Sequence, residues 1–146
     1  MEKFAFILHP LSLQDMEHLS PLMRYIPDPI IEACLKMKKP FKVSHITGIK
    51  SPYAEAEGWF IGCPLTAKQM VELPEEFVMD RIIESGKVAQ ELGAKIVGLG
   101  AFTSIVGDAG ITVAKNLDIA VTSGNSYTVA TAIQGTKQAA RMMGKD

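Results

Sequence analysis

Small polar residues follow two predicted strands of the chain, at the point where each strand ends. Gly100–Ile105 reads Gly-Ala-Phe-Thr-Ser-Ile, and Thr122–Tyr127 reads Thr-Ser-Gly-Asn-Ser-Tyr and leads directly into the last predicted helix. The first-turn amides of a helix have no partner within it and carry partial positive charge, so they suit an anionic or carbonyl-bearing ligand. Because ligands of open α/β sheets bind at the carboxyl ends of the strands, we expect both segments to form one binding corner.

Each of these segments also has a simpler interpretation. Taken alone, either one is a connection whose hydroxyls cap a helix or a turn. Gly98-Leu-Gly-Ala-Phe-Thr-Ser104 is similar to the start of a dinucleotide-binding fingerprint, but Thr103 stands where the third glycine is required. No acidic residue ends the following strand to hold a ribose. A tight turn, whose glycines allow close backbone approach, is therefore the favoured interpretation.

The other residues that could do chemistry point to ordinary structural roles. Cys63 has no cation or base nearby in the sequence to form a thiolate, so a buried structural thiol is expected. His18 and His45 occupy polar positions, and Asp108 is expected in a turn. His9 follows the first predicted strand and is a minor candidate at the sheet edge. The sequence predicts no catalytic residue and no metal ligand.

The composition indicates one globular domain of 146 residues, with 47% apolar and 21% charged residues. A net charge of −1 without a basic cluster argues against a nucleic-acid partner. The apolar run Phe4–Leu8 is too short for a signal peptide or a membrane span, so no integral membrane segment is expected. Cys34 and Cys63 suggest free thiols and a cytoplasmic location.

Apolar patterning predicts alternating strands and helices. Strands are expected at Lys3–Leu8, Phe41–Ile49, Gly58–Cys63, Lys95–Leu99 and Asp118–Thr122. Helices are expected at Ser12–Leu19, Ile30–Met37, Thr66–Leu73 and Pro74–Leu92, and a last one ends at Met143. This order indicates an α/β fold: a single domain with a mixed, mostly parallel sheet and helices on both faces. The first, fourth and fifth strands should lie centrally, while Val43–Ile49 and Gly58–Cys63 should pair nearer an edge.

Four segments together carry a resemblance to a known family: His9–Leu13, Glu57–Cys63, Gly100–Ile105 and Thr122–Thr128. They resemble the N-terminal domain of the aldehyde-forming fatty acyl-acyl carrier protein reductases. More broadly, the chain is similar to the shikimate-dehydrogenase-like, amino-acid-dehydrogenase-like N-terminal domains. The match is best from Glu57 to Gly144.

This resemblance implies that residues 1–146 form the substrate-side domain of a larger enzyme. In the family, an NAD(P)-binding Rossmann domain follows and brings the cysteine that forms the acyl-enzyme, so NADP is expected in the full-length protein. This chain alone is expected to bind no cofactor and to catalyse no reduction. The residues that the resemblance places along the substrate cleft are Gly100, Phe102, Thr103, Ser104, Thr122, Gly124, Asn125 and Thr128.

Three functions remain open at this point. The first is the substrate-binding half of an NAD(P)-dependent oxidoreductase that acts on an acyl thioester or a related carbonyl compound. The second is the equivalent domain of a shikimate-, quinate- or amino-acid-type dehydrogenase, and the third is a non-catalytic ligand-binding module. The expected partners are the substrate and the C-terminal Rossmann domain, and a homo-oligomer stays open.

Overall fold

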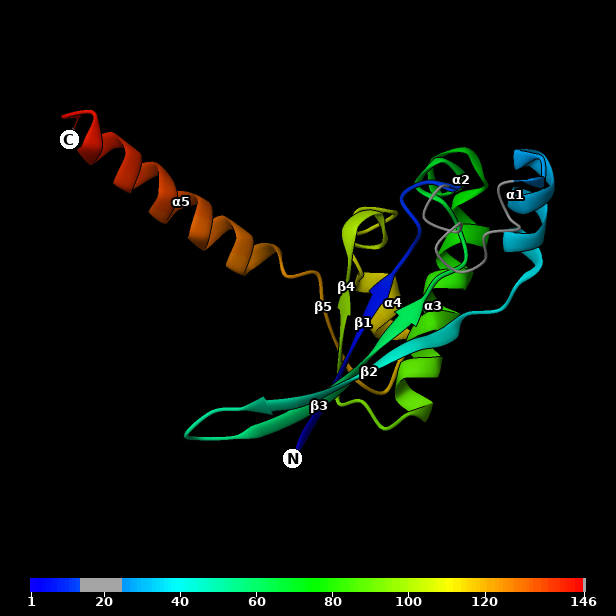
Figure 1. The fold of residues 1–146 in the computed structure, drawn as a ribbon, viewed down its shortest axis with the longest axis horizontal. Coiled ribbons are helices and arrows are strands. Elements are labelled where there is room, and N and C mark those ends of the chain that lie inside the picture. The colour runs from blue at the N-terminus through cyan, green and yellow to red at the C-terminus, as the bar shows by residue number, and fades with distance from the viewer. Residues whose placement is uncertain (14–24, 146) are drawn as a thin grey trace.

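The computed structural model describes residues 1–13 and 25–145 (Figure 1). The helix expected at Ser12–Leu19 falls largely outside them. The strands are β1 (Glu2–Leu8), β2 (Phe41–Lys50), β3 (Glu55–Gly62), β4 (Ile96–Leu99) and β5 (Ala120–Thr122). The helices are α1 (Asp28–Met37), α2 (Ala67–Glu72), α3 (Glu75–Glu91), the 3₁₀ turn η3 (Ala101–Ser104), α4 (Ile111–Lys115) and α5 (Asn125–Met142).

The strands form one five-stranded sheet in the order β2-β3-β1-β4-β5. β1 is parallel to both β3 and β4, β5 is parallel to β4, and β2 runs antiparallel to β3. The predicted α/β fold with a mixed, mostly parallel sheet in a single domain is therefore confirmed, as is the pairing of β2 with β3 at an edge. The prediction that Asp118–Thr122 lies centrally is wrong, because β5 pairs only with β4 and forms the other edge.

One face of the sheet packs against α3 and holds the main core. Ile7, Ile61 and Val97 from the three central strands are fully buried there. Residues of α2, α3 and α4 belong to the same cluster: Met70, Val78, Ile82, Ile83, Ala89 and Val113. α1 lies beside α2 and α3, since the Gln69 side chain donates to the Glu32 carbonyl at 2.9 Å.

The opposite face of the sheet, here called the open face, is apolar and carries none of the described helices. By strand register its apolar side chains include those of Phe4, Phe6, Leu8, Ile46, Phe60 and Ile96, with Gly58, Gly62 and Gly98 between them. The polar residues Glu2, Ser44 and Thr122 lie on the same face. Phe6 and Leu8 are each 38% exposed. The structure thus differs from the expected helices on both faces within the described residues, because the helix that ends the chain does not fold back onto the sheet.

Helix α5 instead extends away from the body of the molecule (Figure 1). None of its 18 residues is buried. It begins after Gly124, whose φ of +72° is in the left-handed region that favours glycine. The helix itself was expected from the sequence, but its separation from the sheet was not. None of the described helices is both long enough and apolar enough to span a membrane.

Several element boundaries follow from local chemistry that the sequence displays. Thr66 and Gln69 form a reciprocal capping box at the start of α2. Gly93, at a φ of +87°, ends α3 as expected. The short helix α4 was not predicted. Its N-cap is Gly110, and Asp108, two residues earlier, accepts the Thr112 amide through both carboxylate oxygens at 3.0 Å.

The two cysteines should differ sharply in reactivity. Both thiols are free, Cys34 is exposed, and burial raises the pKa of the Cys63 thiol to about 11. Because the thiolate is the nucleophile, a group that stays protonated and buried reacts slowly. We expect iodoacetamide at neutral pH to modify Cys34 alone in the folded chain and both residues in urea, as counted by intact-mass spectrometry. Labelling of Cys63 in the folded chain of a Cys34→Ser variant would contradict this assignment.

Candidate functional site

The two polar segments leave the same edge of the sheet from neighbouring strands. Gly98 of β4 and Thr122 of β5 are register partners, and the strands are parallel. Gly100 lies two residues after Gly98, and Gly124 lies two residues after Thr122. The two loops therefore begin at the same level of the carboxyl edge (Figure 1). This is the edge at which open α/β sheets bind ligands.

The first loop folds into the four-residue turn η3, and its hydroxyls hold that turn. Thr103 is 1% exposed and its hydroxyl donates to the Gly100 carbonyl at 2.7 Å. The Ser104 hydroxyl donates to the Ala101 carbonyl, also at 2.7 Å. Ala101 has a φ of +49°, a left-handed conformation that costs a non-glycine residue about 1 kcal/mol or more. Thr103 therefore supports the loop from within, whereas we expected it to face a ligand.

His9 connects the loop after β1 to the loop after β4. Its Nε2 accepts a hydrogen bond from the Phe102 amide at 3.2 Å, and its Nδ1 lies 3.1 Å from the Pro10 carbonyl. These bonds assign the tautomer with the proton on Nδ1. The Phe102 ring meets the imidazole edge to face at 5.9 Å. The Nδ1 contact orients the ring, and the Nε2 contact then holds the Phe102 amide.

The second loop presents exposed polar groups at the start of α5. Thr122 Oγ1 accepts the Gly124 amide at 3.2 Å, and the Thr128 hydroxyl donates to the Gly124 carbonyl at 3.3 Å. Gly124 is the N-cap, so Asn125 is the first helical residue and its side chain is exposed. Asn125 therefore does not cap α5. The Asn125 backbone amide donates to the Ser123 hydroxyl at 3.5 Å. The first turn of a helix is where an anion or carbonyl oxygen would bind.

The glycines of the Gly98–Ser104 segment serve packing within the sheet. A Cβ on Gly98 would lie 2.5 Å from the Phe6 ring, and one on Gly100 would lie 2.6 Å from the Ile7 carbonyl oxygen. The turn that follows has four residues, too short to offer a phosphate the dipole of a full helix. Neither feature favours a dinucleotide at this segment, and the absence of a cofactor stays a prediction.

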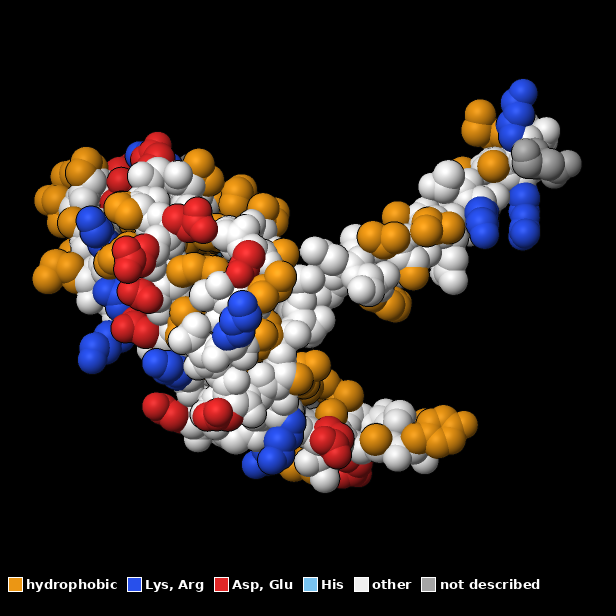
Figure 2. Space-filling view, turned by 180° about the vertical axis from the view of Figure 1, so that it is seen from behind, with side chains coloured by type: hydrophobic (Ala, Val, Ile, Leu, Met, Phe, Trp, Pro, Cys, Tyr) orange, Lys and Arg blue, Asp and Glu red, His pale blue; other side chains and the backbone are white. Residues whose placement is uncertain are grey.

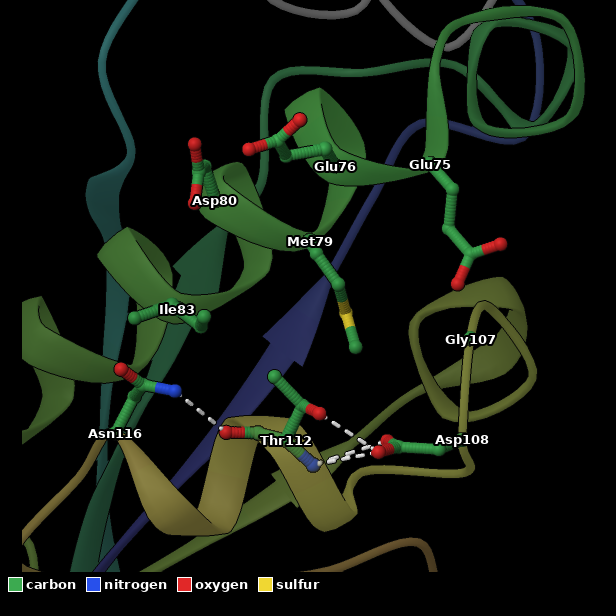
Figure 3. A pocket seen from close by; sticks show the side chains of 9 residues that line it. All are labelled: Glu75, Glu76, Met79, Asp80, Ile83, Gly107, Asp108, Thr112 and Asn116. Carbon is green, nitrogen blue, oxygen red and sulfur yellow. Dashed lines mark hydrogen bonds between the residues drawn. The ribbon is translucent and has the colours of Figure 1, made fainter.

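A groove that the sequence did not reveal lies between α3 and α4 (Figure 3). Its volume is about 630 Å³, and it has an acidic rim formed by Glu75, Glu76, Asp80 and Asp108. The hydrogen bond from the Thr112 amide lowers the pKa of the Asp108 carboxyl group. Among the described residues no three potential metal ligands come together. None of the eight predicted site residues lines this groove.

The comparisons with known proteins relate the chain to part of a longer protein. A curated protein named aminotransferase PigE, from a Serratia species, is 38% identical over 87 residues. The match covers 60% of this chain and about a tenth of that relative's length. No protein-family model matches the chain. The resemblance to the N-terminal domains of acyl reductases stays a prediction.

The Ile7 carbonyl oxygen lies so close to Gly100 that a Cβ at this position should lower the stability of the fold. We expect Gly100→Ala to lower the free energy of unfolding by about 1–3 kcal/mol, because the new Cβ meets a backbone oxygen that cannot move freely. Urea denaturation followed by circular dichroism measures this loss. Gly135→Ala is the matched control: nothing lies within 4 Å of its Cβ position, and it should hold or raise stability. Equal effects of the two substitutions would contradict the packing argument.

The imidazole of His9 should contribute to stability through the Phe102 amide. His9→Ala leaves that amide without its acceptor, and we expect a loss of about 1–3 kcal/mol in the same denaturation assay. His45→Ala provides the comparison, since His45 is largely exposed and bonds to Glu57 at the surface. That change should cost less than about 1 kcal/mol. A smaller loss for His9→Ala than for His45→Ala would show that the link between the loops is weak.

Proposed function

We propose that this chain is the substrate-binding domain of an NAD(P)-dependent oxidoreductase that acts on an acyl thioester or a related carbonyl compound. The observation that carries the proposal is the exposed start of α5 beside the loop after β4, at the carboxyl edge of a mostly parallel sheet. The domain orients the substrate and does not itself catalyse its reduction.

The chemistry of the corner supports a neutral carbonyl substrate. The segments Gly100–Ile105 and Thr122–Thr128 contain no charged residue. Amide donors at a helix start polarise a carbonyl oxygen without a formal charge. A small acidic substrate of the shikimate type would need a cation, such as a Lys, in this lining, so the dehydrogenase alternative has less support. The third alternative, a non-catalytic ligand-binding module, would use the same donors.

Strain in the first loop agrees with a binding role. Ala101 holds a left-handed backbone conformation directly before Phe102, and the buried Thr103 fixes the turn from below. Strained backbone concentrates at ligand-binding positions, where the surrounding structure maintains it. In this proposal the half-buried Phe102 provides the apolar wall of the corner, and Asn125 provides the polar one.

The residues of this chain leave the reducing chemistry to another domain. The buried Cys63 stays protonated far above neutral pH, so it does not serve as the nucleophile for a thioester. Gly98 and Gly100 lie against Phe6 and the backbone of β1, so in this proposal the segment Gly98–Ser104 holds no nucleotide. We therefore assign the dinucleotide and the acyl-enzyme cysteine to the Rossmann domain that the resemblance implies.

The similarity to aminotransferase PigE is compatible with carbonyl chemistry. An aminotransferase needs an aldehyde or ketone as amino acceptor, and reduction of an acyl thioester yields an aldehyde. A domain that handles such compounds would therefore fit within a protein that also transfers amino groups. Because the match covers about a tenth of that relative, we carry over no aminotransferase activity to this chain.

Ligand binding at the corner can be measured directly on this chain. The probe is a pantetheine thioether that keeps the carbonyl of an acyl thioester as a ketone and cannot be hydrolysed. We expect it to shift the amide NMR resonances of Gly100–Ile105 and Thr122–Thr128. Asn125→Ala should weaken its binding about fivefold, the effect of losing one hydrogen bond of about 1 kcal/mol. The free energy of unfolding should not fall, because Asn125 caps nothing.

Two controls make this test decisive. Gln138 lies on the same exposed helix about three and a half turns from Asn125, so Gln138→Ala should leave the affinity unchanged. Shikimate and NADPH should produce no shifts. Shifts confined to the groove between α3 and α4, or equal affinities of the two variants, would overturn the assignment of ligand binding to the corner. Micromolar NADPH binding would overturn the assignment of the dinucleotide to another domain.

A further inference from the structure

Within residues 1–13 and 25–145, two surfaces lack the partner that their chemistry requires. The open face presents half-exposed phenylalanine and leucine side chains, although the strands of a mostly parallel sheet are normally covered on both sides. Helix α5 has no buried residue and carries the apolar stripe Val129, Ile133 and Ala140. Figure 2 shows apolar side chains along this extended helix and its basic side chains toward its far end.

Helix α5 has little stability of its own. Helices in proteins owe most of their stability to packing of an apolar face and little to intrinsic propensity. Thr128, Thr131, Thr136 and Gly135 are weak helix formers within it. A helix of this composition depends on packing its apolar stripe against another surface.

We propose that α5 of each copy packs across the open face of a second copy, so that two chains exchange their last helices. The sheet lacks one helix, and the same chain holds one helix without a sheet, so a second copy supplies what each copy lacks. The helix points away from its own sheet after a hinge of two residues, Ser123 and Gly124. A short hinge of this kind is the usual origin of exchanged elements.

Charge indicates the direction in which the helix lies. α5 contains the cations Lys137 and Arg141 near its C-terminus and no Asp or Glu from Asn125 to Met142. On the open face, Glu2 is exposed at the amino end of β1. An α5 that runs antiparallel to β1 places its cations near Glu2 and its apolar stripe over Phe6. Complementary charges at the rim set orientation more than affinity.

The area of the exchanged contacts is sufficient for a dimer. A helix of 18 residues is about 27 Å long and about 10 Å wide. Two such helices, counted on both the helix and the sheet side, bury on the order of 1,100 Å², which is just above the roughly 1,000 Å² expected of a biological interface. The proposal extends beyond the proposed function and needs no ligand.

Sedimentation velocity of the 146-residue chain tests the association. We expect a dimer at micromolar concentration, and we expect Ile133→Asp to raise its dissociation constant on the order of a hundredfold, since it buries a carboxylate. Gln138→Asp is the matched control, because it adds the same charge on the opposite side of α5 and should leave the dimer intact. A monomeric wild-type chain, or equal effects of the two variants, would overturn the proposal.

Cross-linking of mixed isotopic forms tests the exchange itself. Equal amounts of ¹⁴N- and ¹⁵N-labelled chain are unfolded together, refolded and treated with an amine-reactive cross-linker. Links from Lys137 of α5, or from Lys145 just after it, to Lys3 or Lys95 at the amino edge of the sheet should join a light and a heavy peptide. Links within one isotopic form alone would show that α5 folds back onto its own sheet and would overturn the exchange. Neither result depends on the thioester analogue, so failure of the proposed function leaves this test intact.

Discussion

The burial of β1 between its two parallel neighbours and beneath α3 is the contact on which the rest of the molecule depends. Ile7 packs with Ile61 and Leu99 from the strands on either side, and all three are almost completely shielded from solvent. This contact fixes the register of β3, β1 and β4. The register in turn brings the ends of the parallel strands to one edge, where His9 meets the turn at Phe102.

Most of the fold could be predicted from residue patterns of short range. The capping box of Thr66 and Gln69, the left-handed Gly93 and the apolar β1 each specify their local structure from a few neighbouring residues. The position of β5 at an edge could not be predicted, because a three-residue strand is apolar whether it has one neighbour or two. The direction of α5 depends on the backbone conformation at Gly124, and the apolar pattern of the sequence does not indicate that conformation.

The candidate site was predictable in place but not in detail. Its two loops are signalled by small polar residues after predicted strands, and the pairing of Gly98 with Thr122 brings them to the same level. The direction of single side chains was not predictable. Thr103 turns inward because its hydroxyl finds the Gly100 carbonyl, and the cap of α5 falls on Gly124 rather than Asn125. The groove between α3 and α4 depends on the unpredicted α4.

The central place of β1 also determines when the chain can fold. Phe4 pairs with Gly58 and with Ile96, which follow it by 54 and 92 positions. As the chain leaves the ribosome, its first strand therefore waits for residues made much later, and closing such long loops slows folding. During this interval an apolar segment near the N-terminus remains unpaired and exposed to aggregation or to chaperones. The yield of folded protein should accordingly depend strongly on the rate of synthesis and on substitutions in the first eight residues.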